Sequence, residues 1–299
     1  MNFIQSSKER WLLYGGLLLF TIGFGLALAI GTDDYQGSRT FEGTPFGLFI
    51  VMAVFIAPIW EELTFRGTYT KNRILRWISL IAIPVFLLIS SAEWVAWLLL
   101  LVFYLLHFLS LCHGFSSLIW KFSLVVNAFL FGFVHYKMAD FASVETAYLV
   151  LFQFAVGLLL IWVTLNFGIV KSMIFHCLYN FVPVLILFLY VQFPDQTVQR
   201  FENENIEVKW SRVPAIGEAS SHYQAGKKLI TVKNMEGAMI YDVLQTNPAA
   251  KRKINELQPW VRFNFQFTLR DTTGGVNLQD EVKRFLETEM VKKIEEDMY

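Results

Sequence analysis

Long apolar runs constrain this chain more than any other feature of its sequence. The first, WLLYGGLLLFTIGFGLALAI at residues 11–30, has the length of about 20 helical residues that crosses the roughly 30 Å hydrocarbon core of a bilayer. It exceeds the roughly 7–15 apolar residues of a signal peptide, so we expect a retained span. Comparable runs continue to residue 192 and predict an all-α polytopic membrane helix bundle of about seven spans. The expected spans are 11–30, 46–76, 77–91, 93–111, 118–137, 145–165 and 169–192.

The distribution of charge divides the chain into two parts near residue 192. Residues 1–192 hold ten Lys or Arg, whereas 193–299 hold fifteen in about half the length. In the second part, IEVKWSRV and VRFNFQFTL alternate apolar and polar residues as strands do, and an amphipathic segment follows Asn277, a suitable helix N-cap. We therefore predict a membrane domain at 1–192 and a soluble α+β accessory domain at 193–299.

The accessory domain shows no catalytic group of residues. Its one histidine is His222, and it has no cysteine. Recruitment of a substrate or a protein partner is one interpretation, and a purely structural cap is an equally good one. The chain has no basic cluster of the kind that binds nucleic acid, so its expected partners are the lipid bilayer and a peptide or membrane-protein substrate.

Loop charges predict the orientation. With the N-terminus in the cytoplasm, seven Lys or Arg fall in the inner loops and two, Arg39 and Lys137, in the outer loops. An odd number of spans then places the accessory domain outside the cytoplasm. We expect an integral protein of a bacterial inner or cell membrane, and the side of the accessory domain depends on whether 77–91 crosses fully.

Charged residues inside an apolar run need an explanation, because an ionisable group at the bilayer centre costs about 2.5–3.5 kcal/mol on insertion scales. Glu61, Glu62 and Arg66 lie within the expected span 46–76. Glu62 and Arg66 are four residues apart and can pair on one helix face, which leaves Glu61 on another face. Considered without the rest of the chain, this segment could also be a cytosolic helix end in which Glu61 and Glu62 are solvated.

Two further spans each carry a histidine with a second motif residue one helical turn away. Phe131 and His135 are four residues apart, as are His176 and Asn180. If 46–76 is one continuous helix, Glu61 lies about 22 Å from its inner end and His135 about 25 Å from the inner end of its own span, so the two match in depth. His176 is expected at only about 12 Å, a mismatch that a helix starting inside the membrane would remove.

These three motifs in this order resemble the CPBP family of CAAX proteases and bacteriocin-processing enzymes, also called Abi proteins. They stand here as Glu61-Glu62-Leu-Thr-Phe-Arg66, Phe131-Gly-Phe-Val-His135 and His176-Cys-Leu-Tyr-Asn180 within 46–192. The 74 residues from Glu61 to His135 exceed the single helical hairpin usual in the family. We interpret about 77–115 as an inserted membrane hairpin, whose even number of spans preserves the directions of the motif helices.

The resemblance implies an intramembrane endopeptidase. In this interpretation Glu61 is the base that polarises a water, His135 orients the water, and His176 and Asn180 donate hydrogen bonds to the oxyanion. Glu62, Arg66 and Phe131 are supporting residues. Alternatively, Glu61, His135 and His176 ligate Zn²⁺ with a water in the open position; the metal-independent mechanism is favoured.

Two other classes of protein remain open. A transporter also keeps charged residues in its spans, although no internal repeat is visible in this sequence. A catalytically inactive relative acting as an immunity or scaffold protein would be expected to lose motif residues, and none is lost here.

Overall fold

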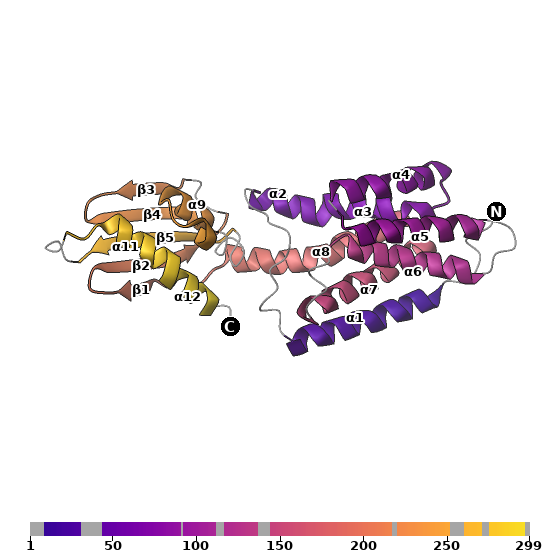
Figure 1. Cartoon of the computed structure of the whole chain (residues 1–299), viewed down its shortest axis with the longest axis horizontal. Helices are drawn as coiled ribbons and strands as arrows, with labels where there is room; N and C mark the ends of the chain where they lie inside the picture. The colour runs from indigo at the N-terminus through magenta and orange to yellow at the C-terminus, as the bar shows by residue number, and fades with distance from the viewer. Residues whose placement is uncertain are drawn as a thin grey trace. The chain divides into compact units, whose positions relative to one another are not determined.

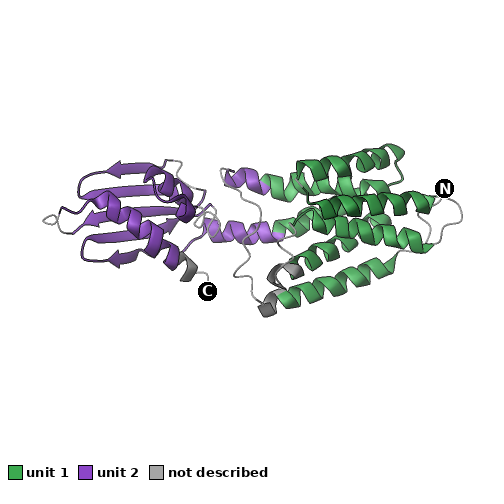
Figure 2. Cartoon of the chain, viewed as in Figure 1, with its two compact units in different colours: residues 1–38, 51–181 green, residues 39–50, 182–299 purple. Residues whose placement is uncertain are grey.

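A computed structural model describes residues 9–30, 44–90, 92–111, 117–136, 144–216, 220–251, 260–270 and 275–296. The chain forms two compact units, shown in Figure 2. Unit 1 comprises residues 1–38 and 51–181, and unit 2 comprises 39–50 and 182–299. Two helical stretches therefore begin in one unit and end in the other.

Unit 1 is helical, as the apolar runs predict (Figure 1). Among the described residues, four helices are long and apolar enough to cross a membrane, namely Phe46–Phe65, Trp94–Leu111, Tyr148–Phe167 and Ile169–Gln192. The apolar stretches Arg10–Leu26 and Ser117–Phe133 are shorter. The protein is thus an integral membrane protein by length and composition, while the expected number of about seven spans is not established. The helices are α1 (Arg10–Ile30), α2 (Phe46–Val51), η1 (Met52–Ile56), α3 (Ala57–Phe65), η2 (Gly67–Tyr69), α4 (Arg73–Ile89), α5 (Trp94–Leu111), α6 (Ser117–Phe133), α7 (Val144–Phe167) and α8 (Ile169–Gln192).

The predicted boundary between the spans 46–76 and 77–91 is wrong. The helical stretch that begins at Phe46 ends at Phe65, and α4 begins at Arg73, where the Asn72 side chain accepts hydrogen bonds from the first free N–H groups. Gly67 lies in the buried turn between them; a Cβ there would come within 2.8 Å of the Ser79 Cβ. A glycine is therefore needed for the chain to turn this closely against α4.

The motif helices have the relative directions that the sequence predicts. Glu61 of α3 contacts His135 in the turn after α6, whereas Phe65, one helical turn later in α3, contacts Asn127 earlier in α6. These two helices therefore run antiparallel. Residues 53 and 62 face 180 and 176 of α8, which makes this pair antiparallel as well. The α4–α5 hairpin therefore leaves α6 and α8 parallel to each other, as expected for an insertion of two helices.

Glycines allow a close contact between α1 and α7 in unit 1. A Cβ on Gly16 of α1 would lie 2.8 Å from the Leu159 side chain of α7, and one on Gly23 would lie 3.1 Å from Phe152. Gly16 meets Leu159 whereas Gly23, later in α1, meets Phe152, earlier in α7, so the two helices run antiparallel. Without side chains at these positions the backbones can approach, which is how helices pack in lipid, where no hydrophobic drive between helices exists.

Unit 2 contains a five-stranded antiparallel sheet in the order β1-β2-β5-β4-β3. The two predicted strands correspond to β2 (Ile206–Val213) and β5 (Arg262–Leu269). The sheet also contains β4 (Leu229–Glu236) and the edge strands β1 (Gln199–Glu202) and β3 (His222–Ala225). The helical elements are α9 (Gly237–Val243), α11 (Leu278–Phe285), η4 (Leu286–Met290) and α12 (Val291–Glu296). The Asn277 side chain caps α11 by accepting from Gln279 N–H, as expected.

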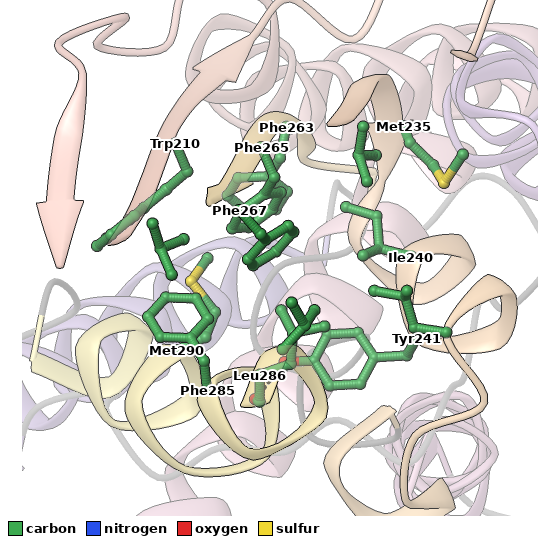
Figure 3. Close-up of a cluster of buried hydrophobic side chains, with 14 of the residues drawn as sticks. Trp210, Met235, Ile240, Tyr241, Phe263, Phe265, Phe267, Phe285, Leu286 and Met290 are labelled. Atoms are coloured by element: carbon green, nitrogen blue, oxygen red, sulfur yellow. Dashed lines mark hydrogen bonds between the residues drawn. The ribbon is translucent and has the colours of Figure 1, made fainter. Parts of the chain in front are cut away.

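One face of the sheet is covered by helices, and the hydrophobic core lies between them (Figure 3). Alternate residues of β2 and β5 point into it, as the period of two requires, and Phe285 of α11 packs on Trp210 at 5.6 Å between ring centroids. The core also includes Phe46 at the start of α2 and Val191 at the end of α8. The ends of two apolar helices are therefore part of the packed interior of the sheet unit.

Candidate active site

The site forms where α3 meets α6 and α8 inside unit 1. Glu61 Oε2 lies 3.7 Å from His135 Nε2 and 3.7 Å from His176 Nε2. Glu61 and His176 are nearly excluded from solvent, while the His135 side chain keeps 12% of its surface exposed. Both separations are too long for direct hydrogen bonds but suit groups that share a bound water.

Each imidazole has its other nitrogen occupied. His135 Nδ1 lies 2.7 Å from Phe131 O, and His176 Nδ1 lies 3.1 Å from Glu62 Oε1. A carbonyl or an ionised carboxylate can only accept, so each Nδ1 must carry a hydrogen and donate it. Both Nε2 atoms are consequently directed at Glu61 and remain for chemistry.

Glu62 is the centre of a buried polar network. Its Oε1 accepts from His176 Nδ1 and lies 3.6 Å from Arg66 Nε, and its Oε2 lies 2.5 Å from the hydroxyl of Ser172, which donates to it. Ser172 is also 3.1 Å from Leu160 O, to which it can turn its hydrogen instead. The expected Glu62–Arg66 pair is present, but the shorter contact of Glu62 is to His176.

Arg66 is enclosed by aromatic rings. Its Cζ lies 3.9 Å from the centroid of the Phe131 ring, within the range of a cation–π interaction, and the residue is fully buried. None of its guanidinium nitrogens makes a hydrogen bond with the described residues. Phe131 also contacts His135 and His176 edge-on, at 5.0 and 5.8 Å between centroids. This one ring thus supports the cation and both imidazoles.

The end of α3 is buried, and neighbouring helices satisfy its last carbonyl groups. Asn127 Nδ2 of α6 donates to Phe65 O at 3.2 Å, and the Ser79 hydroxyl of α4 donates to Thr64 O at 2.5 Å. Such partners are required because the last carbonyls of a helix have no partner within it.

The depth calculation from the sequence fails because α3 ends at Phe65. Glu61 is four residues from that end, or about 6 Å, rather than about 22 Å, and His176 is about 10 Å from the start of α8. The expected equality with the roughly 25 Å of His135 is therefore lost, although Glu61 and His135 lie 3.7 Å apart, because the helices end at different levels. The connection before α8 is a tight turn at Gly168, whose φ of +88° favours glycine.

Asn180 lies further along α8 than the Glu61 cluster. Its Nδ2 donates to Ala53 O at 3.0 Å, inside the π-helical segment η1 that precedes α3. A π-helix displaces backbone carbonyls from the regular ladder, and such segments often lie beside functional sites. The structure therefore brings together Glu61, Glu62, Arg66, Phe131, His135 and His176, and gives Asn180 a contact that fixes the approach to α3.

A comparison with family models matches the part of the chain that carries these residues. Residues 43–182 match the model of the type II CAAX prenyl endopeptidases described as Rce1-like. Over these residues the chain matches the CPBP family of CAAX-type membrane proteases, which the three motifs resemble. No curated protein and no solved structure gives a significant match. The matched residues contain all three motifs and the α4–α5 hairpin, and they end before the strands of unit 2.

Ser172 and Asn127 are site residues that the sequence analysis missed. Ser172 is four residues before His176, and Asn127 is four residues before Phe131. Both extend a motif by one helical turn on the same face, so their spacing was a usable signal. In an apolar span the side chain of a Ser or Asn is expected to form a hydrogen bond, because burying a polar group in hydrocarbon without one costs free energy.

Metal ligation was the alternative for Glu61, His135 and His176. Imidazoles whose Nδ1 is held by a carbonyl or carboxylate are typical of metal sites. A search of the described residues identifies no group of three or more His, Cys, Asp or Glu as a metal site. The separations of 3.7 Å between Glu61 Oε2 and the two Nε2 atoms are nevertheless close to those between ligands of one tetrahedral Zn²⁺. Glu61, His135 and His176 would be the residues to hold such an ion, which would polarise the attacking water.

Proposed function

We propose that this protein is an intramembrane endopeptidase that hydrolyses a peptide bond with a water activated by Glu61. The observation that carries the proposal is the position of Glu61 Oε2, 3.7 Å from the Nε2 atoms of both His135 and His176. A water between these groups can donate one hydrogen to Glu61 and one to His135 Nε2. Its lone pair then faces outward, toward a scissile carbonyl.

The proton balance assigns a role to each group. Glu61 accepts the proton as the water oxygen attacks, and it later returns this proton to the leaving nitrogen. Glu61 is the base rather than Glu62, because Glu62 already accepts from Ser172 and His176.

His176 is the proposed oxyanion donor. With hydrogens on both nitrogens it donates Nδ1–H to Glu62 and Nε2–H to the charge that develops on the substrate carbonyl oxygen. Asn180, whose side chain is bonded to Ala53 O, is proposed as a positioning residue that holds η1 and so the start of α3. The substrate is a peptide or membrane protein that reaches the site within the bilayer.

Comparative proteomics of membrane peptides tests this function. Cells carrying Glu61→Gln should accumulate uncleaved substrates and lose the corresponding products, with residual cleavage reduced by about 10²–10⁴-fold. Glu207→Gln, which makes the same change at a partly exposed position of β2, is the matched control and should cleave normally. Native levels of cleavage by a folded, inserted Glu61→Gln protein would refute the role of Glu61, and identical peptide profiles with and without the native protein would favour an inactive relative.

A further inference from the structure

A cavity of about 270 Å³ lies in unit 2 and is lined by none of the candidate active-site residues. Its apolar wall is formed by Trp210, Phe263 and Met290, all largely buried and labelled in Figure 3. Its polar lining includes Asp195, Arg212 and Lys293. At this size the cavity is at the lower limit of small-molecule sites and suits a ligand of headgroup dimensions.

Aromatic rings hold the two cations of the cavity. Lys293 Nζ lies 4.9 Å from the centroid of the Trp210 ring, and Arg212 Cζ lies 5.8 Å from that of Tyr190. Arg212 Nη1 also donates to Tyr190 Oη at 3.2 Å. Within the described residues, the ammonium of Lys293 has no carboxylate partner, so its charge remains to be neutralised.

Asp195 adds one negative charge. Its Oδ1 accepts from the Thr197 hydroxyl at 2.6 Å and from the Thr197 N–H at 2.9 Å. These bonds, with the nearby Arg212 guanidinium, lower the pKa of the Asp195 carboxyl and keep it ionised. The described lining thus combines two cations, Arg212 and Lys293, with one carboxylate, which suits a ligand that carries both a phosphate and an ammonium group.

The lining of the cavity begins three residues after the end of an apolar helix. The apolar helix α8 ends at Gln192, whose side chain exchanges two hydrogen bonds of 2.8 Å with the backbone of Ile216, and Tyr190 is in its last turn. Asp195 is three residues further on, so it is at most about 11 Å from Gln192. The headgroup layer on each side of a bilayer is roughly 5–8 Å thick, and tyrosine is enriched there.

We propose that this cavity binds the headgroup of a membrane phospholipid. The phosphodiester is placed between Arg212 and Lys293, where charge-assisted hydrogen bonds to both cations form. An ammonium group on the headgroup, as in an ethanolamine lipid, lies against Asp195, whose Oδ2 makes no hydrogen bond with the described residues. The bound lipid would attach the accessory domain to the membrane surface beside α8.

Lipid binding by the full-length protein tests this inference. Delipidated protein in detergent is titrated with dihexanoyl phosphatidylethanolamine, and the bound lipid is counted by native mass spectrometry. Lys293→Gln should weaken binding about tenfold, because each bond to a charged group contributes enough for such a change. Lys233→Gln, an equal charge change on an exposed position of β4, is the control and should bind as the native protein does.

Two further arms identify the ligand. Inorganic phosphate should compete poorly with the lipid, and Asp195→Asn should reduce the preference for the ethanolamine over the glycerol headgroup. Equal affinities in Lys293→Gln and Lys233→Gln would overturn the site. Phosphate that competes as well as the lipid would reject a lipid as its source, and an unchanged headgroup preference in Asp195→Asn would refute the ammonium contact.

Discussion

Replacing Glu62 by Gln examines the buried network directly. The change keeps the shape of the side chain but removes the negative charge from a position with no solvent exposure. The bond to Ser172 can survive in reverse, because the amide can donate to the Ser172 hydroxyl while that hydroxyl turns to Leu160 O, 3.1 Å away. The amide oxygen must still face both His176 and the Arg66 guanidinium.

The cost of this change therefore comes mainly from Arg66. Its guanidinium is fully buried, lacks hydrogen bonds with the described residues and has Glu62 as its nearest counter-charge, at 3.6 Å. Leaving one member of a buried pair uncompensated costs about 3–5 kcal/mol. Since domains are stable by about 5–15 kcal/mol, a large part of the stability is at risk. The melting temperature should fall by roughly 6–20 °C.

Thermal unfolding in detergent, followed by circular dichroism or intrinsic fluorescence, measures this loss. The double variant Glu62→Gln, Arg66→Met should recover much of it, because replacing both members of a buried pair by groups of similar shape is often neutral. Glu207→Gln, which removes a surface partner of Lys209, should leave the melting temperature unchanged. If Glu62→Gln melts at the same temperature as the native protein, the pairing is refuted. A double variant that melts below the single variant would refute it as well.

Three further outcomes are expected. Ser172→Ala should lower kcat by about tenfold or more with little change in KM, through misorientation of His176, and Ser172→Thr should restore part of it; an equal loss in both variants would count against hydrogen bonding as the cause. Activity should survive dialysis and o-phenanthroline, with metal below one equivalent per chain, whereas a loss that zinc restores would establish a metalloprotease. A cysteine placed by Ser220→Cys, in a Cys112→Ala, Cys177→Ala background, should react with an impermeant maleimide in intact cells; labelling only after the membrane is opened would place the accessory domain in the cytosol and require a new span count.

The sequence alone determined that the first part of the chain is built of apolar helices, and it singled out Glu61, His135 and His176, which the structure brings together. Apolar runs long enough to cross a bilayer leave little choice but helices, because backbone groups in lipid must be hydrogen-bonded within the segment. The spacing of four residues marked Glu62 and Arg66, Phe131 and His135, and His176 and Asn180, since residues at this spacing share a helix face. Strict alternation marked β2 and β5 in the same way.

The ends of the helices were harder to predict. Gly67 and Asn72 were available as turn and N-cap signals, but the expectation of a helix that crosses the whole bilayer outweighed them. The same expectation assigned Phe46 to a membrane span, whereas its ring packs 5.2 Å from Trp260 in the core of the sheet unit. An apolar residue is equally suited to lipid and to a protein interior, so only the fold distinguishes the two.

Tertiary structure alone decided how the site is connected. Spacing along one helix predicts that Glu62 meets Arg66, but the contact with His176 depends on how α8 is rotated about its axis, and that rotation is set by packing against α3 and α7. The same holds for Asn180, which local spacing places beside His176 but which the packing of α8 directs to Ala53 O. Contacts between helices follow from the fit of whole surfaces, and this information is distributed over residues far apart in the chain.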